Sequence, residues 1–193
     1  LLLAGGYSPG LCEWQSWEIA DGENIHPSMQ IDAQGTVHLG YVSISFDDNG
    51  VFSATELRYV ELRDGVIESE RVIDTLEANP LLAGGNYIAL ALDTAGRPHI
   101  AYCTAYDGAL KYAFMDAAGW HTEIVSPNGA TPYISLAVGA GGMPSIVYYD
   151  TAQSALQCAM RNGTVWELTT VDAGASAQSS HSIAVAQDGT PHI

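Results

Sequence analysis

One segment of this sequence recurs four times around a glycine, and the copies align without a gap. The aligned glycines are Gly35, Gly96, Gly142 and Gly189. Apolar residues recur four and six positions before and after them: Met29, Ile31, Leu39 and Tyr41; Leu90, Leu92, Ile100 and Tyr102; Leu136, Val138, Ile146 and Tyr148; Ile183, Val185 and Ile193. Spacing by two on both sides of a glycine turn predicts a β-hairpin, with these apolar columns buried.

Two more strand-like stretches follow each of the first three hairpins. The third stretch reads "LRYV" from residue 57, "LKYA" from 110 and "LQCA" from 156. The fourth stretches contain Trp120 and Trp166 at equivalent places, which we expect near the contact between sheets. The pattern predicts no helix, and it predicts strands near 36–42, 88–93, 98–104, 110–115, 120–125, 134–138, 144–149 and 156–160.

Four-stranded units of about 45 residues are typical of β-propeller blades. A small twisted sheet cannot bury both of its faces alone, whereas blades stacked around an axis bury them. The sequence therefore predicts an all-β fold: a partial β-propeller of about 3.5 four-stranded antiparallel blades. A complete propeller of six or seven such blades would need about 280–330 residues.

The repeat divides the chain into residues 1–13 and an incomplete propeller over residues 14–193. The expected blades span 26–79, 80–130, 131–177 and, in part, 178–193. The opening "LLLAGG" is either the tail of a signal peptide or a leading strand. "WQSWEI", residues 14–19, predicts a fourth strand without its own blade. Such a chain would form an open arc with unpaired strands that promote self-association.

Acidic residues dominate the charge of the chain. There are 22 Asp and Glu against 6 Lys and Arg, so the formal net charge is −16. This field repels phosphate backbones, and no apolar run reaches the roughly 18 residues of a membrane helix. We therefore expect neither nucleic acid binding nor membrane insertion. Cys12, Cys103 and Cys158 form no CxxC pair, which argues against a zinc site and a disulfide framework.

The repeat resembles a family of secreted bacterial propeller repeats with the pattern S-I/L-A-V/L-x-x-x-G-x-P-H-I/V-x-Y-x-D, then L-x-Y-A and W-x-x-E-x-V. These repeats are similar to fucose-type lectins and sialidase-like propellers. The resemblance covers roughly residues 14–193 and implies a location outside the cell or in the cell envelope. The sialidase S-x-D-x-G-x-x-W motif is absent. Arg58 and Lys111 share a column, but Gln157 breaks it, so the lectin site cannot be transferred.

Blade one is longer than the others at two places on one rim. About eight extra residues fall in "SISFDDNGVFSAT" and about six in "DTLEANPLLAGGN". Insertions on one face of a repeat protein often mark its binding face. The first insertion contains Phe46, Asp47 and Asp48, whose carboxylates either ligate Ca²⁺ or belong to an ordinary turn. No other cofactor is expected.

Further binding candidates lie on the same rim: His26, Tyr87, Tyr106, Asp107, Tyr133, Asp150 and His181. Tyrosine faces with fixed carboxylate acceptors suit sugar or peptide recognition. The histidines of the second-strand column, His38, His99 and His192, sit near the opposite rim. We interpret these histidines as structural, with hydrogen bonds between blades.

No nucleophile–base set can be read from the sequence, so no catalytic residue is assigned. The leading hypothesis is a secreted, non-catalytic binding or scaffold propeller for carbohydrate or a partner protein. One alternative is a glycan-cleaving, sialidase-like enzyme whose catalytic residues lie partly in other blades. Another is a structural repeat of a larger surface protein.

Overall fold

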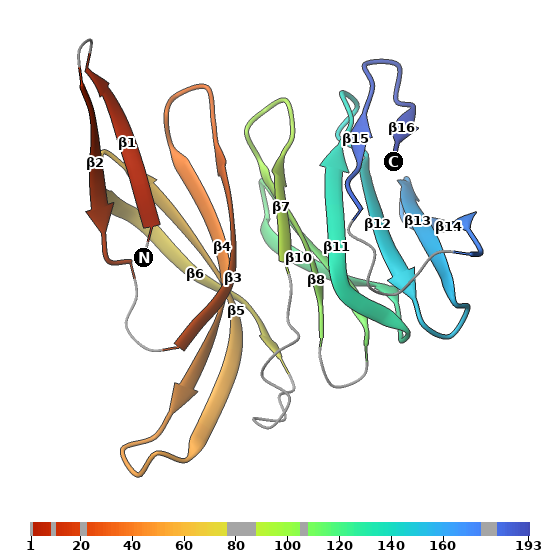
Figure 1. Cartoon of the computed structure of the whole chain (residues 1–193), viewed down its shortest axis with the longest axis horizontal. Helices are drawn as coiled ribbons and strands as arrows, with labels where there is room; N and C mark the ends of the chain where they lie inside the picture. Colours follow the sequence, from red (N-terminus) through yellow and green to blue (C-terminus); the bar gives the residue numbers. More distant parts are fainter. Residues whose placement is uncertain (1, 9–10, 20–22, 77–87, 105–107, 175–180) are drawn as a thin grey trace.

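The computed structural model describes residues 2–8, 11–19, 23–76, 88–104, 108–174 and 181–193. Every regular element in these ranges is a strand, so the predicted all-β class is confirmed. The strands form three four-stranded antiparallel sheets and two two-stranded sheets (Figure 1). Within the described ranges no helix has the length and apolarity to cross a membrane.

The three four-stranded sheets are consecutive blades, each with its strands in chain order. Blade one contains β3 (Glu23–Ile31), β4 (Val37–Phe46), β5 (Phe52–Arg63) and β6 (Val66–Leu76). Blade two contains β7 (Ile88–Leu92), β8 (Pro98–Cys103), β9 (Leu110–Asp116) and β10 (Gly119–Ser126). Blade three contains β11 (Ala130–Val138), β12 (Pro144–Asp150), β13 (Ala155–Asn162) and β14 (Val165–Asp172). All eight predicted strand positions are confirmed.

The aligned glycines occupy the predicted hairpin turns. Gly35 and Gly96 have φ values of +82° and +77°, which a side chain would disfavour. The N–H of each donates to the carbonyl three residues earlier, from Asp32 and Asp93 respectively. A fourth turn of this kind at Gly189 joins β15 (Ala184–Val185) to β16 (Pro191–His192).

The first strands of successive blades lie side by side and form the inner edge of the arc. β3 adjoins β7, β7 adjoins β11, and β11 adjoins β15 (Figure 1). Serine side chains link two of these neighbours: Ser28 Oγ accepts from Leu90 N at 3.0 Å, and Ser135 Oγ accepts from Ile183 N at 3.2 Å. Inner strands of different blades are therefore joined through side chains, outside the backbone ladder of each sheet.

The predicted N-terminal strand forms over the first part of its range and belongs to no four-stranded sheet of the described residues. β2 (Leu11–Trp17) pairs along its whole length with β1 (Leu2–Ser8), in a separate antiparallel hairpin. The "WQSWEI" segment is therefore strand-forming only in its first part, and β2 has a local partner. A short connection brings the two sequence-adjacent strands together more readily than a distant blade edge.

Apolar faces of neighbouring blades meet to form the core. The contact between blades one and two includes Val42, Leu57, Tyr59, Leu76, Leu90, Ile100, Tyr102 and Ala113. The contact between blades two and three includes Ala101, Cys103, Leu110, Tyr112, Val125, Ala130, Leu136, Ile146, Tyr148 and Ala159. Each blade thus offers alternate residues of a strand to opposite neighbours, as the period of two requires.

The predicted burial of the apolar columns fails at the start of blade one and at Ile193, which is 50% exposed. Leu90 and Leu136 are buried as expected, but their counterpart Met29 is 39% exposed, and Ile31 is 59% exposed. Met29 pairs with Leu39 and so lies on the side of blade one that faces away from blade two. On that side Leu39, Tyr41, Val60 and Leu62 are buried, so the exposure belongs to the edge strand β3 and not to the whole face.

The two tryptophans predicted to be equivalent do occupy the same place in successive blades. Trp120 meets the ring of Tyr59 at 4.9 Å between centroids, and Trp166 meets Tyr112 at 5.2 Å. Both contacts are edge-to-face, and both cross from one blade to the next. The predicted location of these rings near the contact between sheets is confirmed.

Side-chain volume is balanced opposite these tyrosines. Tyr59 pairs across the sheet with Gly40, and Tyr112 pairs with Ala101. A Cβ on Gly40 would lie 3.1 Å from Ile88 Cδ1 of blade two. In blade three the equivalent pair is Val147 on β12 and Cys158 on β13. The larger side chain is therefore on the second strand of this blade, not on the third. The next blade therefore meets a differently shaped face at each contact.

Replacing Trp166 with alanine is expected to lower the free energy of unfolding by about 2 kcal/mol, less than for a fully buried tryptophan. The variant loses the edge-to-face contact with Tyr112 and the 3.1 Å hydrogen bond from Nε1 to Glu123 Oε1. Val165→Ala, in the same strand and 61% exposed, is the matched control and should be near neutral. Urea denaturation followed by fluorescence measures both. Equal effects of the two variants would contradict this packing.

Candidate functional site

The pairing of the inner strands is interrupted at equivalent places in blades one and three. In blade one the register between β3 and β4 shifts between Ile25 and Ser28, which leaves His26 at the irregularity. In blade three the register between β11 and β12 shifts between Ala130 and Ile134, around Tyr133. Bulges of this kind redirect side chains and are common beside functional sites.

His26 and Tyr133 are both accessible at these irregularities. His26 has a φ of +53°, is half-buried, and has a pKa lowered by desolvation. Tyr133 is 43% exposed. Both stand nine positions before their turn glycines, on inner strands that each adjoin β7. The structure thus places these two predicted residues at matching points of the inner edge.

His181 and Asp150 are nearby candidates that also serve the fold. His181 Nε2 lies 3.1 Å from the carbonyl of Val147, so the ring is held against blade three. Asp150 is 4% exposed, and its Oδ1 accepts from the N–H groups of Ala152 and Gln153 at 2.8 and 3.1 Å. This carboxylate therefore caps the turn between β12 and β13.

Phe46, Asp47 and Asp48 lie apart from this inner edge. They occupy the tip of the long β4–β5 hairpin, which extends beyond the other strands at the lower side of Figure 1. The first predicted insertion is therefore a hairpin extension. Tyr87, Tyr106 and Asp107 lie outside the described residues. Among the described residues, no group of three or more His, Cys, Asp or Glu side chains has an arrangement that could hold a metal ion.

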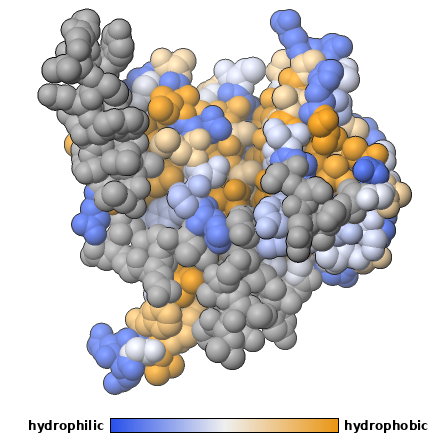
Figure 2. Space-filling view, in the orientation of Figure 1, coloured by the Kyte–Doolittle hydropathy of each residue, from blue (hydrophilic) through white to orange (hydrophobic). Residues whose placement is uncertain are grey.

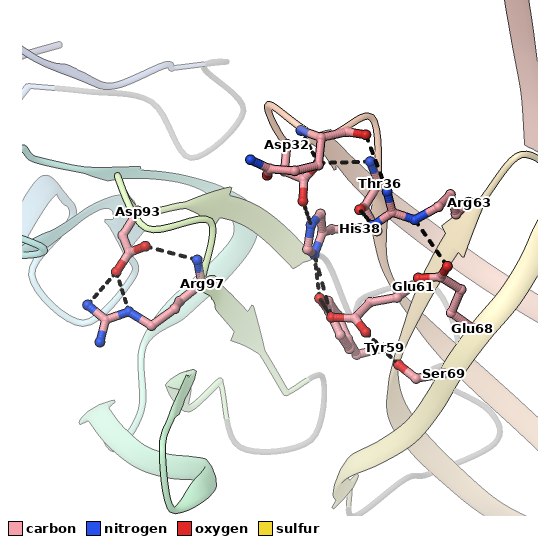
Figure 3. A network of polar contacts seen from close by, with 11 residues as sticks. Asp32, Thr36, His38, Tyr59, Glu61, Arg63, Glu68, Ser69, Asp93 and Arg97 are labelled. Carbon is pink, nitrogen blue, oxygen red and sulfur yellow. Dashed lines mark hydrogen bonds and ion pairs between the residues drawn. The ribbon is translucent and has the colours of Figure 1, made fainter.

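The structure reveals a repeated Asp–His–Tyr cluster near the turn glycines; Figure 3 shows the cluster of blade one, with Asp93 and Arg97 of blade two. In blade one, His38 Nδ1 contacts the hydroxyl of Tyr59, and His38 Nε2 lies 3.4 Å from Asp32 Oδ2. In blade two, His99 Nδ1 contacts the Tyr112 hydroxyl, and its Nε2 lies 3.7 Å from Asp93 Oδ2. All four His and Tyr side chains of these clusters are buried.

The predicted role of these histidines was partly wrong. His38 and His99 are structural, but their partners belong to their own blades. The cause is the sheet register: His38 faces Glu61 across β4 and β5, so Tyr59 lies diagonally beside it on the same face. His192, in the two-residue strand β16, is exposed.

In the blade-two cluster, the Asp93 carboxylate also forms an ion pair with Arg97. The pKa of the Asp93 carboxyl is below its usual value: burial raises it, but the N–H and guanidinium of Arg97 outweigh that effect. Arg97 Nη2 lies 2.6 Å from Asp93 Oδ2 and neutralises its charge. Burial lowers the pKa of His99 more than Asp93 raises it, which favours the neutral ring.

Below these clusters, basic side chains are held by carboxylates. Arg58 contacts Glu56 at 2.8 Å and Glu70 at 2.7 Å, and Glu70 also accepts from the Tyr41 hydroxyl. Burial and this carboxylate raise the pKa of Tyr41 to about 12. In blade two, Lys111 and Tyr102 share Asp74 of blade one, at 3.0 and 2.8 Å. Arg58 thus stabilises the sheet of blade one, and Lys111 stabilises the contact between blades one and two.

Comparisons with solved structures support the propeller architecture. One solved structure comes from work on the GH130 family of mannoside phosphorylases, which contains glycoside hydrolases that target β-1,2-mannosidic linkages in Candida mannan. It aligns with this chain with a TM-score of 0.50 and 14% sequence identity. The alignment covers 97% of this chain, which spans 55% of that structure. At this identity the likeness concerns the fold alone.

Two further neighbours align less closely. A fucose lectin from Kordia zhangzhouensis in complex with methyl-fucoside has a TM-score of 0.45 and 15% identity, over 76% of this chain and 99% of the lectin. The Hadza microbial sialidase Hz136 has a TM-score of 0.44 and 12% identity, over 75% and 37% of the two chains. No protein-family model and no curated protein matches the sequence.

The buried His99 should make stability depend on pH. Its pKa is lower in the folded chain than in the unfolded one, where it is about 6.5. As the pH falls below that value the unfolded chain takes up the proton first, so the stabilisation is present at higher pH and is lost on acidification. The stability advantage of the wild type over His99→Gln should shrink between about pH 7.5 and pH 5.

Thermal unfolding of both proteins at each pH measures this difference. His121→Gln is the control, because His121 is exposed and pairs with Asp116 at the surface. Its difference from wild type should not shrink on acidification. A constant wild-type advantage over His99→Gln would show that His99 titrates alike in both states.

Proposed function

We propose that this chain is a non-catalytic carbohydrate-binding propeller segment that acts outside the cell or in the cell envelope. The observation that carries the proposal is the exposed ring of Tyr133, at a strand irregularity that His26 matches in blade one. An exposed aromatic face suits a sugar, which has an apolar face and a rim of hydroxyls, and the His26 ring offers a polar group at the matching place in blade one.

Glycans are the first ligands to test because the structural neighbours are described as glycan-cleaving or glycan-binding proteins. The state of Asp150, one of the predicted rim carboxylates, favours binding over cleavage. Asp150 is buried, and both of its oxygens face donors of its own turn, including Gln153 Nε2 at 3.4 Å from Oδ2. A carboxylate committed in this way is poorly placed to act as a general acid or nucleophile.

The test is binding of the 193-residue chain to an array of fucosides, mannosides and sialosides, followed by calorimetry on the best ligand. Tyr133→Ala should weaken binding about 3- to 10-fold, the effect of losing one aromatic contact. His26→Ala should weaken it as well. Phe46→Ala, on the distant hairpin, is the matched aromatic control and should bind like the wild type.

Two outcomes would overturn this proposal. One is the absence of binding to every glycan on the array, or binding that Tyr133→Ala leaves unchanged. The other is turnover: release of nitrophenol from aryl fucosides or mannosides, or of sialic acid from sialyllactose, would establish a glycan-cleaving enzyme in place of a binding module.

A further inference from the structure

Blade one has a projecting arm, residues 45–54, that blades two and three lack. β4 and β5 contain 10 and 12 residues, whereas β8 and β9 contain 6 and 7, and β12 and β13 contain 7 and 8. The added length extends past the sheet as a free hairpin (Figure 1). Because the shorter strands build complete blades, the fold does not need this arm.

The tip of the arm exposes apolar side chains. Phe46 is 47% exposed and Val51 is 59% exposed. Phe46 and Phe52 contact each other edge-to-face, with 6.4 Å between ring centroids. Figure 2 shows this lobe as a protrusion with apolar residues behind a hydrophilic end. Together these residues form a small apolar cluster that belongs to none of the buried clusters of the described residues.

Hydrogen bonds give the tip a defined shape. Asp47 N donates to Val51 O at 2.7 Å, and Gly50 N donates to Asp47 O at 2.9 Å, with a φ of +74° at Gly50. Asp47 Oδ1 also accepts from the N–H groups of Asn49 and Val51, at 2.9 and 2.8 Å. These bonds, first that from Val51, lower the pKa of Asp47 and keep it charged. A tip ordered before binding loses less entropy on association.

Shape and charge determine what such a tip can meet. Small-ligand sites are concave, so a convex tip suits insertion into a partner protein's surface better than enclosure of a sugar. Asp47 and Asp48 are its charged groups, and residues 45–57 contain no Lys, Arg or His. The nearest cation in sequence, Arg58, is held by Glu56 and Glu70. Anionic membranes, nucleic acid and a second copy of this −16 chain would all repel it.

We propose that the arm docks onto a partner protein that presents an apolar surface flanked by lysine or arginine side chains. Phe46, Val51 and Phe52 contact the apolar part, and the carboxylates of Asp47 and Asp48 face the cations. Aromatic anchors with surrounding charges are the arrangement in which a few residues dominate an interface. The proposal concerns a surface separate from the glycan site and does not depend on it.

The probe is a fluorescent amphipathic helical peptide of leucine and lysine, and a leucine–glutamate peptide of the same pattern is its control. Fluorescence anisotropy with the full 193-residue chain should show binding of the lysine peptide only. Phe46→Ala combined with Val51→Ala should weaken binding at least about tenfold, because the anchors are lost. Asp47→Asn with Asp48→Asn should weaken it and reduce its salt dependence, while the turn keeps an acceptor at residue 47.

Matched variants separate this contact from attraction to an acidic protein in general. Glu167→Gln with Asp172→Asn, on exposed positions of β14, removes the same charge and should bind like the wild type. Tyr133→Ala should also bind like the wild type. Equal weakening by the two charge variants, or no effect of the aromatic variant, would overturn the proposal. Loss of glycan binding on Phe46→Ala would also overturn it, by assigning the arm to carbohydrate.

Discussion

Burial of sheet faces between blades is the constraint on which this structure depends. A four-stranded antiparallel sheet of short strands has two apolar faces and cannot cover either by itself. Ile100 and Tyr102 of blade two turn toward blade one, whereas Ala101 and Cys103, one residue on, turn toward blade three. Each strand therefore contributes to two cores. Full burial of one such aliphatic side chain is worth about 1.5–3 kcal/mol, so stability comes from contacts between blades.

The two buried histidines within this apolar stack form small polar clusters. The buried histidines are held by a tyrosine of the next strand and lie near an aspartate of the preceding turn, and the tyrosine in turn packs on a tryptophan of the following blade. The cluster fixes the position of the turn and the tilt of the aromatic contact together. The rim on the other side is left to vary, which is where the arm and the strand irregularities occur.

The alignment on glycine predicted the strands, the turns and the tryptophan equivalence, because these depend on local spacing. It failed to predict burial where the exposure of a side chain depends on what packs beside its strand. Met29 is exposed although it has the same place in the repeat as the buried Leu90 and Leu136, and no pattern around residue 29 records that difference. The Asp–His–Tyr cluster did leave a signal. Its three positions change together in blade three, to Gly139, Ser145 and Cys158. The candidate site residues stay a prediction, and the sequence did not show their division between inner edge and arm, since that depends on hairpin length.

The exchange of large and small residues across the sheets has a consequence for assembly. Tyr59 opposite Gly40, Tyr112 opposite Ala101, and Cys158 opposite Val147 give each blade a differently shaped face toward its successor. Repeats with near-identical faces can stack in the wrong order or exchange between chains while folding. Here a blade docked onto the wrong neighbour would meet either a void or a collision. The blades thus share one backbone plan, while their side chains specify the order in which they stack.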